Sequence, residues 1–165
     1  MRLLDLCLLE NSKPLAGWIS CSLAAIFLLC FTSTQGQSAP SEKQSKAVHQ
    51  LIDKYSEARE KKDTVLLKAI LTEDVDQLVS NGEWRNGIQS SVKGMLKSSA
   101  ASPGTRTLVV DKIRMLNKSA AIVDCRYEIV NPDGSLRKMW STFVVLEEKS
   151  TWRISAIRNM LPGQP

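Results

Sequence analysis

Few residues in this chain of 165 have the types and spacing that catalysis usually requires. The chain contains one histidine, His49, and after residue 36 it contains one cysteine, Cys125. No set of Cys and His has the spacing of a zinc site, and there is neither a glycine-rich phosphate loop nor a Gly-x-Ser-x-Gly motif. The sequence therefore supports no metal site, no nucleotide site and no serine hydrolase, and we expect no cofactor.

His49 and Cys125 both have structural explanations. His49 lies on or near the polar edge of a helix pattern, and a lone cysteine in a strand pattern is usually a small buried hydrophobe. In the same strand, alternation places Asp124, Arg126 and Glu128 on one face. That face is either solvated or the lining of a pocket, in which Arg126 would bind an anion.

An apolar leader precedes the elements that must position these side chains. Residues 15–31 carry no charge, Arg2 and Lys13 precede them, and small polar residues follow, which is the pattern of a secretory signal. Asp5 and Glu10 depart from that pattern because they offset the positive charge.

We expect residues 1–36 to form a signal peptide cut after Gly36, and residues 37–40 to form a linker. The product would be secreted or periplasmic and have no membrane contact after cleavage. The alternative is an uncleaved membrane anchor through residues 15–31, although this run is short beside the roughly 20 residues that a spanning helix needs.

The composition is that of an ordinary globular domain, with 43% hydrophobic and 24% charged residues. The formal net charge of +5 is modest, and the charged residues are scattered along the chain. We therefore expect a solvated charged surface and no nucleic-acid partner.

The hydrophobic pattern after residue 40 predicts helices first and strands afterwards. Ser41 and Gln44 form a capping-box pattern at the start of a long amphipathic helix, Asp63 can cap a second helix, and a third follows from Ile88. A polar connection is expected over residues 98–104. The predicted strands are 75–80, 105–116, 119–130, 136–148 and 151–158. Short turns between successive strands predict an α+β fold with an antiparallel meander.

Several short motifs in this order resemble the SnoaL-like, nuclear-transport-factor-2-like superfamily. Residues 57–63 and 69–76 resemble its passage between the first two helices and its exit from the second. Residues 81–87 resemble its hairpin, with Asn86 where the superfamily usually has arginine. Residues 120–124 resemble one of its strands, and residues 140–144 and 152–158 resemble its last two strands.

The similarity covers nearly all of residues 41–162, and the nearest variants are stand-alone proteins of unknown function of the SgcJ/EcaC type. It implies three helices packed on a strongly curved antiparallel sheet, a cystatin-like cone with a central pocket, often as a homodimer. The fold alone implies no single activity, because it serves enzymes and binding proteins alike.

The resemblance also implies where a site would lie. Asp76 leaves the second helix near the expected pocket mouth, so it is the candidate general base, unless it is only a strand-end carboxylate. Arg158 would hold a ligand carboxylate or pair with an acidic residue of a neighbouring strand. The candidate ligand-binding residues are Trp84, Arg126, Trp140, Thr142 and Arg158.

Three functions are compatible with these residues, and whether the protein is an enzyme stays open. The first is an exported, homodimeric domain that binds a small apolar or amphipathic molecule in its pocket. The second is a cofactor-independent lyase, isomerase or cyclase that uses Asp76 as base and Arg126 or Trp84 to orient a carbonyl compound. The third is a protein-interaction module on the outer face of the sheet. The first two differ in whether Asp76 and Arg126 must face one dry cavity.

Overall fold

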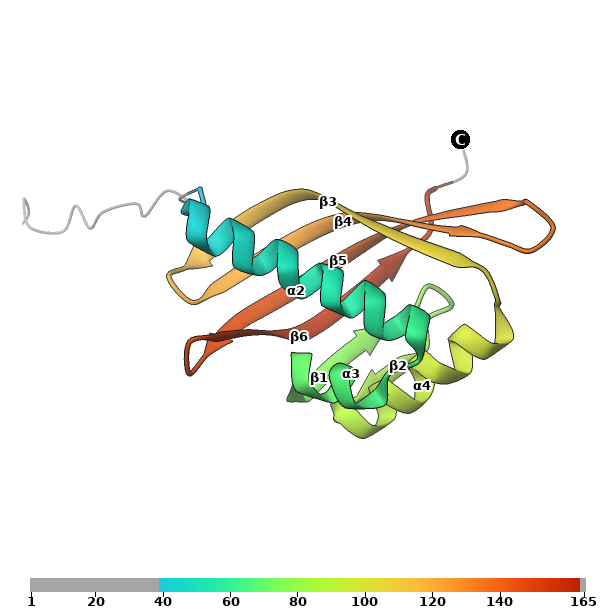
Figure 1. The fold of residues 1–165 in the computed structure, drawn as a ribbon, viewed down its shortest axis with the longest axis horizontal. Coiled ribbons are helices and arrows are strands. Elements are labelled where there is room, and N and C mark those ends of the chain that lie inside the picture. The colour runs from blue at the N-terminus through green and yellow to red at the C-terminus, as the bar shows by residue number, and fades with distance from the viewer. Residues whose placement is uncertain (1–38, 164–165) are drawn as a thin grey trace, which may run out of the picture. The chain divides into compact units, whose positions relative to one another are not determined.

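The computed structural model describes residues 39–163 (Figure 1). The predicted signal peptide of residues 1–36, its cut after Gly36 and the alternative anchor all lie outside the described residues. Within residues 39–163, no helix combines the length and apolar character needed to cross a membrane.

Two of the three described helices begin at the residues that the sequence predicted. Helix α2 (Glu42–Lys61) starts with a complete capping box, in which the Ser41 hydroxyl accepts from the Gln44 amide and the Gln44 side chain accepts from the Ser41 amide. Helix α3 (Thr64–Ile70) starts at Asp63, whose carboxylate accepts from two backbone amides at 2.9 Å. Side-chain caps thus separate the first two helices as expected.

Helix α4 (Gly87–Ala101) is longer than predicted. Its last turn occupies residues 98–101, which the sequence pattern assigned to a polar connection. Ser99 in this turn is buried and accepts a hydrogen bond from Arg59 of α2. A tertiary contact therefore stabilises a polar helical turn that hydrophobic periodicity alone does not reveal.

The sheet has six strands in the order β2-β1-β6-β5-β4-β3. Their bounds are β1 (Leu71–Leu78), β2 (Trp84–Asn86), β3 (Thr105–Asn117), β4 (Ala120–Val130), β5 (Leu136–Glu148) and β6 (Thr151–Met160). The long strands β3 to β6 form the predicted antiparallel meander. The predicted turn at Asn81-Gly82 is also present, with Gly82 at a φ of +89°.

One pairing differs from the expected antiparallel sheet, because β1 runs parallel to β6. Strand β1 starts directly after α3, at Leu71, and lies beside the last strand of the chain. No short turn dictates that pairing, so local sequence signals could not reveal it. The fold class is the predicted α+β, with the sheet mixed and not closed.

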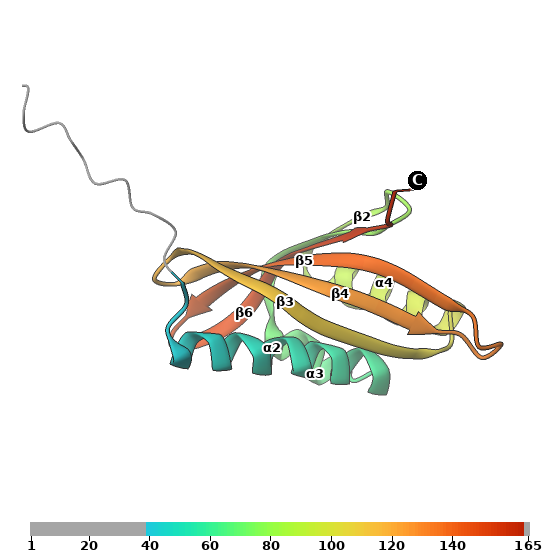
Figure 2. The ribbon, with the colours of Figure 1, turned by 90° about the horizontal axis from the view of Figure 1, so that it is seen from above.

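All three helices pack on one face of the sheet and share one apolar core. Figure 2 shows α2 and α3 along the same side of the twisted strands. The core joins residues such as Ile52 of α2, Leu67 of α3 and Met95 of α4 to Phe143 and Ile154 of the strands. Alternate strand residues point toward these helices, as the period of two requires.

The hairpin of β1 and β2 is fastened to α4 through Arg85. This side chain is buried, and it donates to Gln77 of β1 at 3.2 Å and to Ser98 of α4 at 3.0 Å. It crosses the helix at Gly94, where a β-carbon would overlap Arg85 Nε, Cδ and Cζ. Because Gly94 has no side chain, it leaves the room that Arg85 needs to pass α4 and reach its hydrogen-bond partners.

Cys125 should be unreactive in the folded protein. Its side chain is fully buried, and burial raises the pKa of the thiol from its ordinary value of 9.0 to about 12. Since the thiolate is the nucleophile, its fraction at pH 8 falls about a thousandfold, on top of the loss of access. Mass mapping after iodoacetamide treatment should find Cys125 unmodified in the native protein and alkylated in urea. Equal rates in both conditions would contradict the burial.

Replacing Gly94 by alanine should destabilise the fold, although alanine is the better helix former. At an exposed helical site this change would stabilise by about 1 kcal/mol. Here we expect a loss of about 1–3 kcal/mol, because the methyl group displaces Arg85 from its buried hydrogen bonds. Urea denaturation of Gly94→Ala measures the change, with Ser90→Ala on the exposed side of α4 as control. An increase in stability for Gly94→Ala would show that Arg85 is free to move.

Candidate functional site

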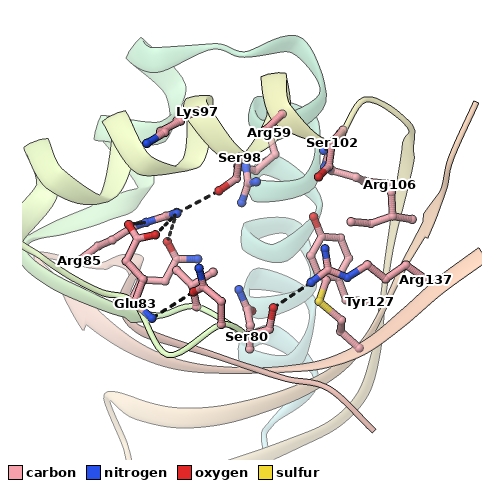
Figure 3. A pocket seen from close by; sticks show the side chains of 17 residues that line it. Arg59, Ser80, Glu83, Arg85, Lys97, Ser98, Ser102, Arg106, Tyr127 and Arg137 are labelled. Atoms are coloured by element: carbon pink, nitrogen blue, oxygen red, sulfur yellow. Dashed lines mark hydrogen bonds and ion pairs between the residues drawn. The ribbon is translucent and has the colours of Figure 1, made fainter.

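A pocket of about 400 Å³ lies between α2, α4, the β1–β2 hairpin and the helical face of the sheet. Figure 3 shows its lining side chains. Strand alternation aims Gln77, Tyr127 and Met139 at this space from β1, β4 and β5. The pocket thus lies on the same face of the sheet as the core.

The lining of this pocket is strongly basic. The described residues that form the lining include one carboxylate, Glu83, and five cationic side chains. These are Arg59, Arg85, Lys97, Arg106 and Arg137. A concave site lined by one sign of charge concentrates ions of the other sign.

Glu83 is fully engaged by one of these cations. Its carboxylate accepts from Arg85 Nε at 2.8 Å and from Arg85 Nη2 at 3.4 Å. These bonds lower the pKa of Glu83, so the group is ionised at neutral pH. The pair neutralises itself, and the excess positive charge belongs to the other arginines and to Lys97.

Arg59 brings a charge into the pocket from α2 without an acidic partner. The residue is only 7% exposed, and within residues 39–163 no carboxylate forms an ion pair with it. Its guanidinium donates to the Tyr55 hydroxyl at 2.9 Å and to Ser99 Oγ at 3.3 Å, while its Nε has no partner. Burial raises the pKa of Tyr55, so that phenol stays neutral and does not balance the charge.

Arg106 and Arg137 approach the same space from β3 and β5. The Arg106 side chain is 6% exposed and forms a long ion pair of 3.9 Å with Glu60. Its Nη atoms donate to the backbone carbonyls of Gly104 and Ser102, and its Nε has no partner. Arg137 is exposed and donates to Ser80 Oγ at 2.9 Å. In Figure 3, Arg59 enters from the helical side and Arg137 from the strand side.

Three of the predicted site residues come together, but on the other face of the sheet. Arg158 forms a two-pronged ion pair with Asp76, with Nη–Oδ distances of 3.0 and 2.9 Å. Its guanidinium also lies 4.8 Å from the centre of the Trp84 ring. The sequence neighbours Gln77 and Arg85 line the pocket, so alternation turns Asp76 and Trp84 away from it.

The remaining predicted site residues also lie outside the pocket lining. Arg126 pairs with Asp111 at 2.8 Å, Thr142 donates to Asp124 at 2.8 Å, and Trp140 is 45% exposed. Asp76 and Arg126 therefore do not face one cavity. For Arg158 the structure shows the alternative interpretation, a pair with an acidic residue of a neighbouring strand.

Sequence reasoning missed the arginines that do line the pocket. A signal existed for Arg59, because it follows Tyr55 by one helical turn and Ala58 by one residue, within the apolar stripe of α2. A second signal was Arg137, which alternates in phase with the buried Met139 and Phe143. Within the described residues no group of three His, Cys, Asp or Glu side chains is placed to hold a metal ion.

No protein-family model matches this sequence, and no curated protein matches it either. Solved structures do match. An NTF-2-like protein of unknown function from Shewanella oneidensis MR-1 is 22% identical, with a TM-score of 0.61 over 70% of this chain and 98% of that one. A Nostoc punctiforme protein of unknown function with a cystatin-like fold is 11% identical, with a TM-score of 0.68 over 77% of this chain and 97% of that one.

A third similar structure is a nuclear transport factor 2 (NTF2-like) superfamily protein from Salmonella enterica. It is 18% identical, with a TM-score of 0.59 over 72% of this chain and 91% of that one. At these identities the likeness concerns the fold. It confirms the resemblance read from the sequence: the described domain has the NTF2-like, cystatin-like fold.

Proposed function

We propose that this domain binds a small organic molecule in the pocket between α2, α4 and the helical face of the sheet. The main observation in support is the volume of the cavity, about 400 Å³, which lies within the usual range for ligand pockets of about 300–1,000 Å³. Fold likeness agrees with this proposal without identifying a ligand, because proteins of this fold have many functions.

The pocket combines an apolar wall with polar groups, as ligand sites usually do. Tyr127, Ile129 and Met139 form an apolar cluster separate from the main core. The rest of the lining includes hydrogen-bonding groups such as Gln77 and Ser98. A ligand with both an apolar part and polar atoms would use both walls.

The enzymatic alternative, with Asp76 as general base, receives less support from the geometry. The Asp76 carboxylate is held by Arg158 on the outer face, and Glu83 is held by Arg85 in the pocket. A base must reach the proton that it removes, and both carboxylates already accept charged hydrogen bonds. We therefore favour ligand binding over acid–base catalysis.

We also propose that the mature protein is exported and forms a homodimer through the outer face of the sheet. The export proposal rests on the leader sequence alone. For the dimer, Trp84, Trp140 and Met160 are 52%, 45% and 47% exposed, and Trp140 is paired with Met160 in the sheet. The Asp76–Arg158 pair beside Trp84 puts charges of both signs on this face, so the face can complement itself across a two-fold axis.

Ligand binding in the pocket is tested by filling it. Ala101 lies at the exposed end of α4 and lines the pocket, whereas the adjacent Ala100 is exposed and does not. Uniformly labelled protein titrated with 3-phenylpropionate and 3-phenylpropanamide should show amide shifts that cluster at Tyr127, Met139 and Asn159. Ala101→Trp should weaken binding at least about tenfold by occupying the space, whereas Ala100→Trp should leave it unchanged.

Two results would refute pocket binding. One is an absence of saturable shifts at pocket residues with either compound. The other is equal affinity in the Ala101→Trp and Ala100→Trp proteins, which would place the binding elsewhere.

Native mass spectrometry of the exported protein tests the dimer and the leader together. We expect a dimer of chains that begin at Gln37, and a monomer for Trp140→Asp, because a buried unpaired carboxylate would oppose the interface. Val65→Asp makes the same change at an exposed residue of α3 and should remain dimeric. A monomeric native protein would refute the dimer, and a chain that retains residues 1–36 would refute the cut.

A further inference from the structure

We infer that the pocket takes an organic anion, whose oxyanion headgroup lies among Arg59, Arg106 and Arg137 and whose apolar part lies on Tyr127, Ile129 and Met139. This inference rests on the proposed ligand-binding function and names the class of ligand.

Two arginines on the outer face of the sheet have carboxylate partners, which Arg59 and Arg137 of the pocket lack. On the outer face, Arg126 pairs with Asp111 at 2.8 Å and Arg158 pairs with Asp76 at 2.9 Å. Within residues 39–163, Arg59 and Arg137 form no ion pair with a carboxylate. Arg59 and Arg137 therefore bring positive charge to the cavity that no carboxylate of the described residues pairs with.

The burial of Arg59 makes this missing counter-charge significant. Removing a guanidinium from water is unfavourable unless an anion and hydrogen bonds replace the lost solvation. Its partners, the Tyr55 hydroxyl, Ser99 and the Met95 carbonyl, are all uncharged. An anion bound beside Arg59 would supply the missing charge.

Unused donors point to the same ligand. Arg59 Nε and Arg106 Nε are both buried without a hydrogen-bond partner. Arg114 and Arg153, outside the pocket lining, share this feature, so it supports a ligand only together with the missing counter-charge of Arg59. Arg59 and Arg137 both line this space, and in Figure 3 they extend into it from the helical side and the strand side. Guanidinium groups bind carboxylate and phosphate oxygens through paired N–H donors, so this arrangement suits an oxyanion.

The apolar wall separates this ligand from a simple inorganic ion. Tyr127, Ile129 and Met139 are each at most 7% exposed and form a cluster apart from the main core, at the pocket. A small hydrated ion would leave this wall without contact. An anion with an aromatic or aliphatic body would contact this wall and remove its remaining exposed surface from water.

The test compares probes that share one body and differ in charge. These are 3-phenylpropionate, 3-phenylpropanamide and 3-phenylpropylamine. Acetate, which has the carboxylate without the phenyl group, is the fourth probe. Calorimetry and amide shifts should show the propionate binding about tenfold or more tightly than the amide, with the amine and acetate weaker still. Added NaCl should weaken the propionate and leave the amide unaffected.

Arg137→Gln removes a pocket charge at an exposed position, so the variant should remain folded. We expect its dissociation constant for the propionate to rise about tenfold, with no change for the amide. Arg126→Gln makes the same substitution on the outer face and loses the same charge, so it should bind both compounds as the parent protein does.

The outcomes separate this inference from the function on which it rests. If the amide or the amine binds in the pocket as tightly as the propionate, the pocket is a ligand site but the anion inference is wrong. Equal weakening by Arg137→Gln and Arg126→Gln would also overturn the inference, since the effect would then be one of net charge. If none of the probes shifts pocket residues, the ligand-binding proposal itself fails.

Discussion

The parallel pairing of β1 with β6 is the contact on which the rest of the structure depends. It joins Asp76 to Arg158 across 82 positions of sequence, in a two-pronged ion pair on the outer face. On the inner face, the same pairing sets Gln77 of the β1–β2 hairpin beside Ile157 of the last strand. Because α4 continues from that hairpin, it too is drawn over the sheet, and Arg85 fixes it there. Without this pairing the meander of β3 to β6 would lack the hairpin and helix that enclose the pocket.

The inner face of the sheet changes character along its length. Where α2 and α3 cover it, the strands supply apolar residues such as Val123, Val145 and Ile154. Toward the start of β5 and the end of β6 the inner positions become polar, and Ser141 donates to Asn159 at 2.8 Å. Close packing can therefore continue only part of the way, since polar groups must find hydrogen-bond partners or solvent. The pocket occupies the part of the same face where the apolar core has stopped.

Much of the fold was predictable because its signals are local. The Ser41 and Asp63 caps, the Asn81-Gly82 turn and the four long alternating strands each depend on neighbouring residues, and the structure contains all of them. The last turn of α4 was not predictable in this way, because its contact with Arg59 joins residues 40 positions apart. The parallel β1–β6 pair has the same explanation.

The sequence by itself determined which side chains share a face, and it could not determine which face encloses a cavity. Alternation correctly grouped Asp124 with Arg126, and Cys125 with Tyr127. A strand with charges on one side and mixed apolar residues on the other is compatible with a pocket on either side. Tertiary structure decided the matter, because the three helices needed an apolar face to bury and so enclosed the side of Tyr127. As a result, Asp76, Trp84 and Arg158 lie on the outer face of the sheet. Arg59, Arg106 and Arg137, from elements far apart in the chain, line one pocket.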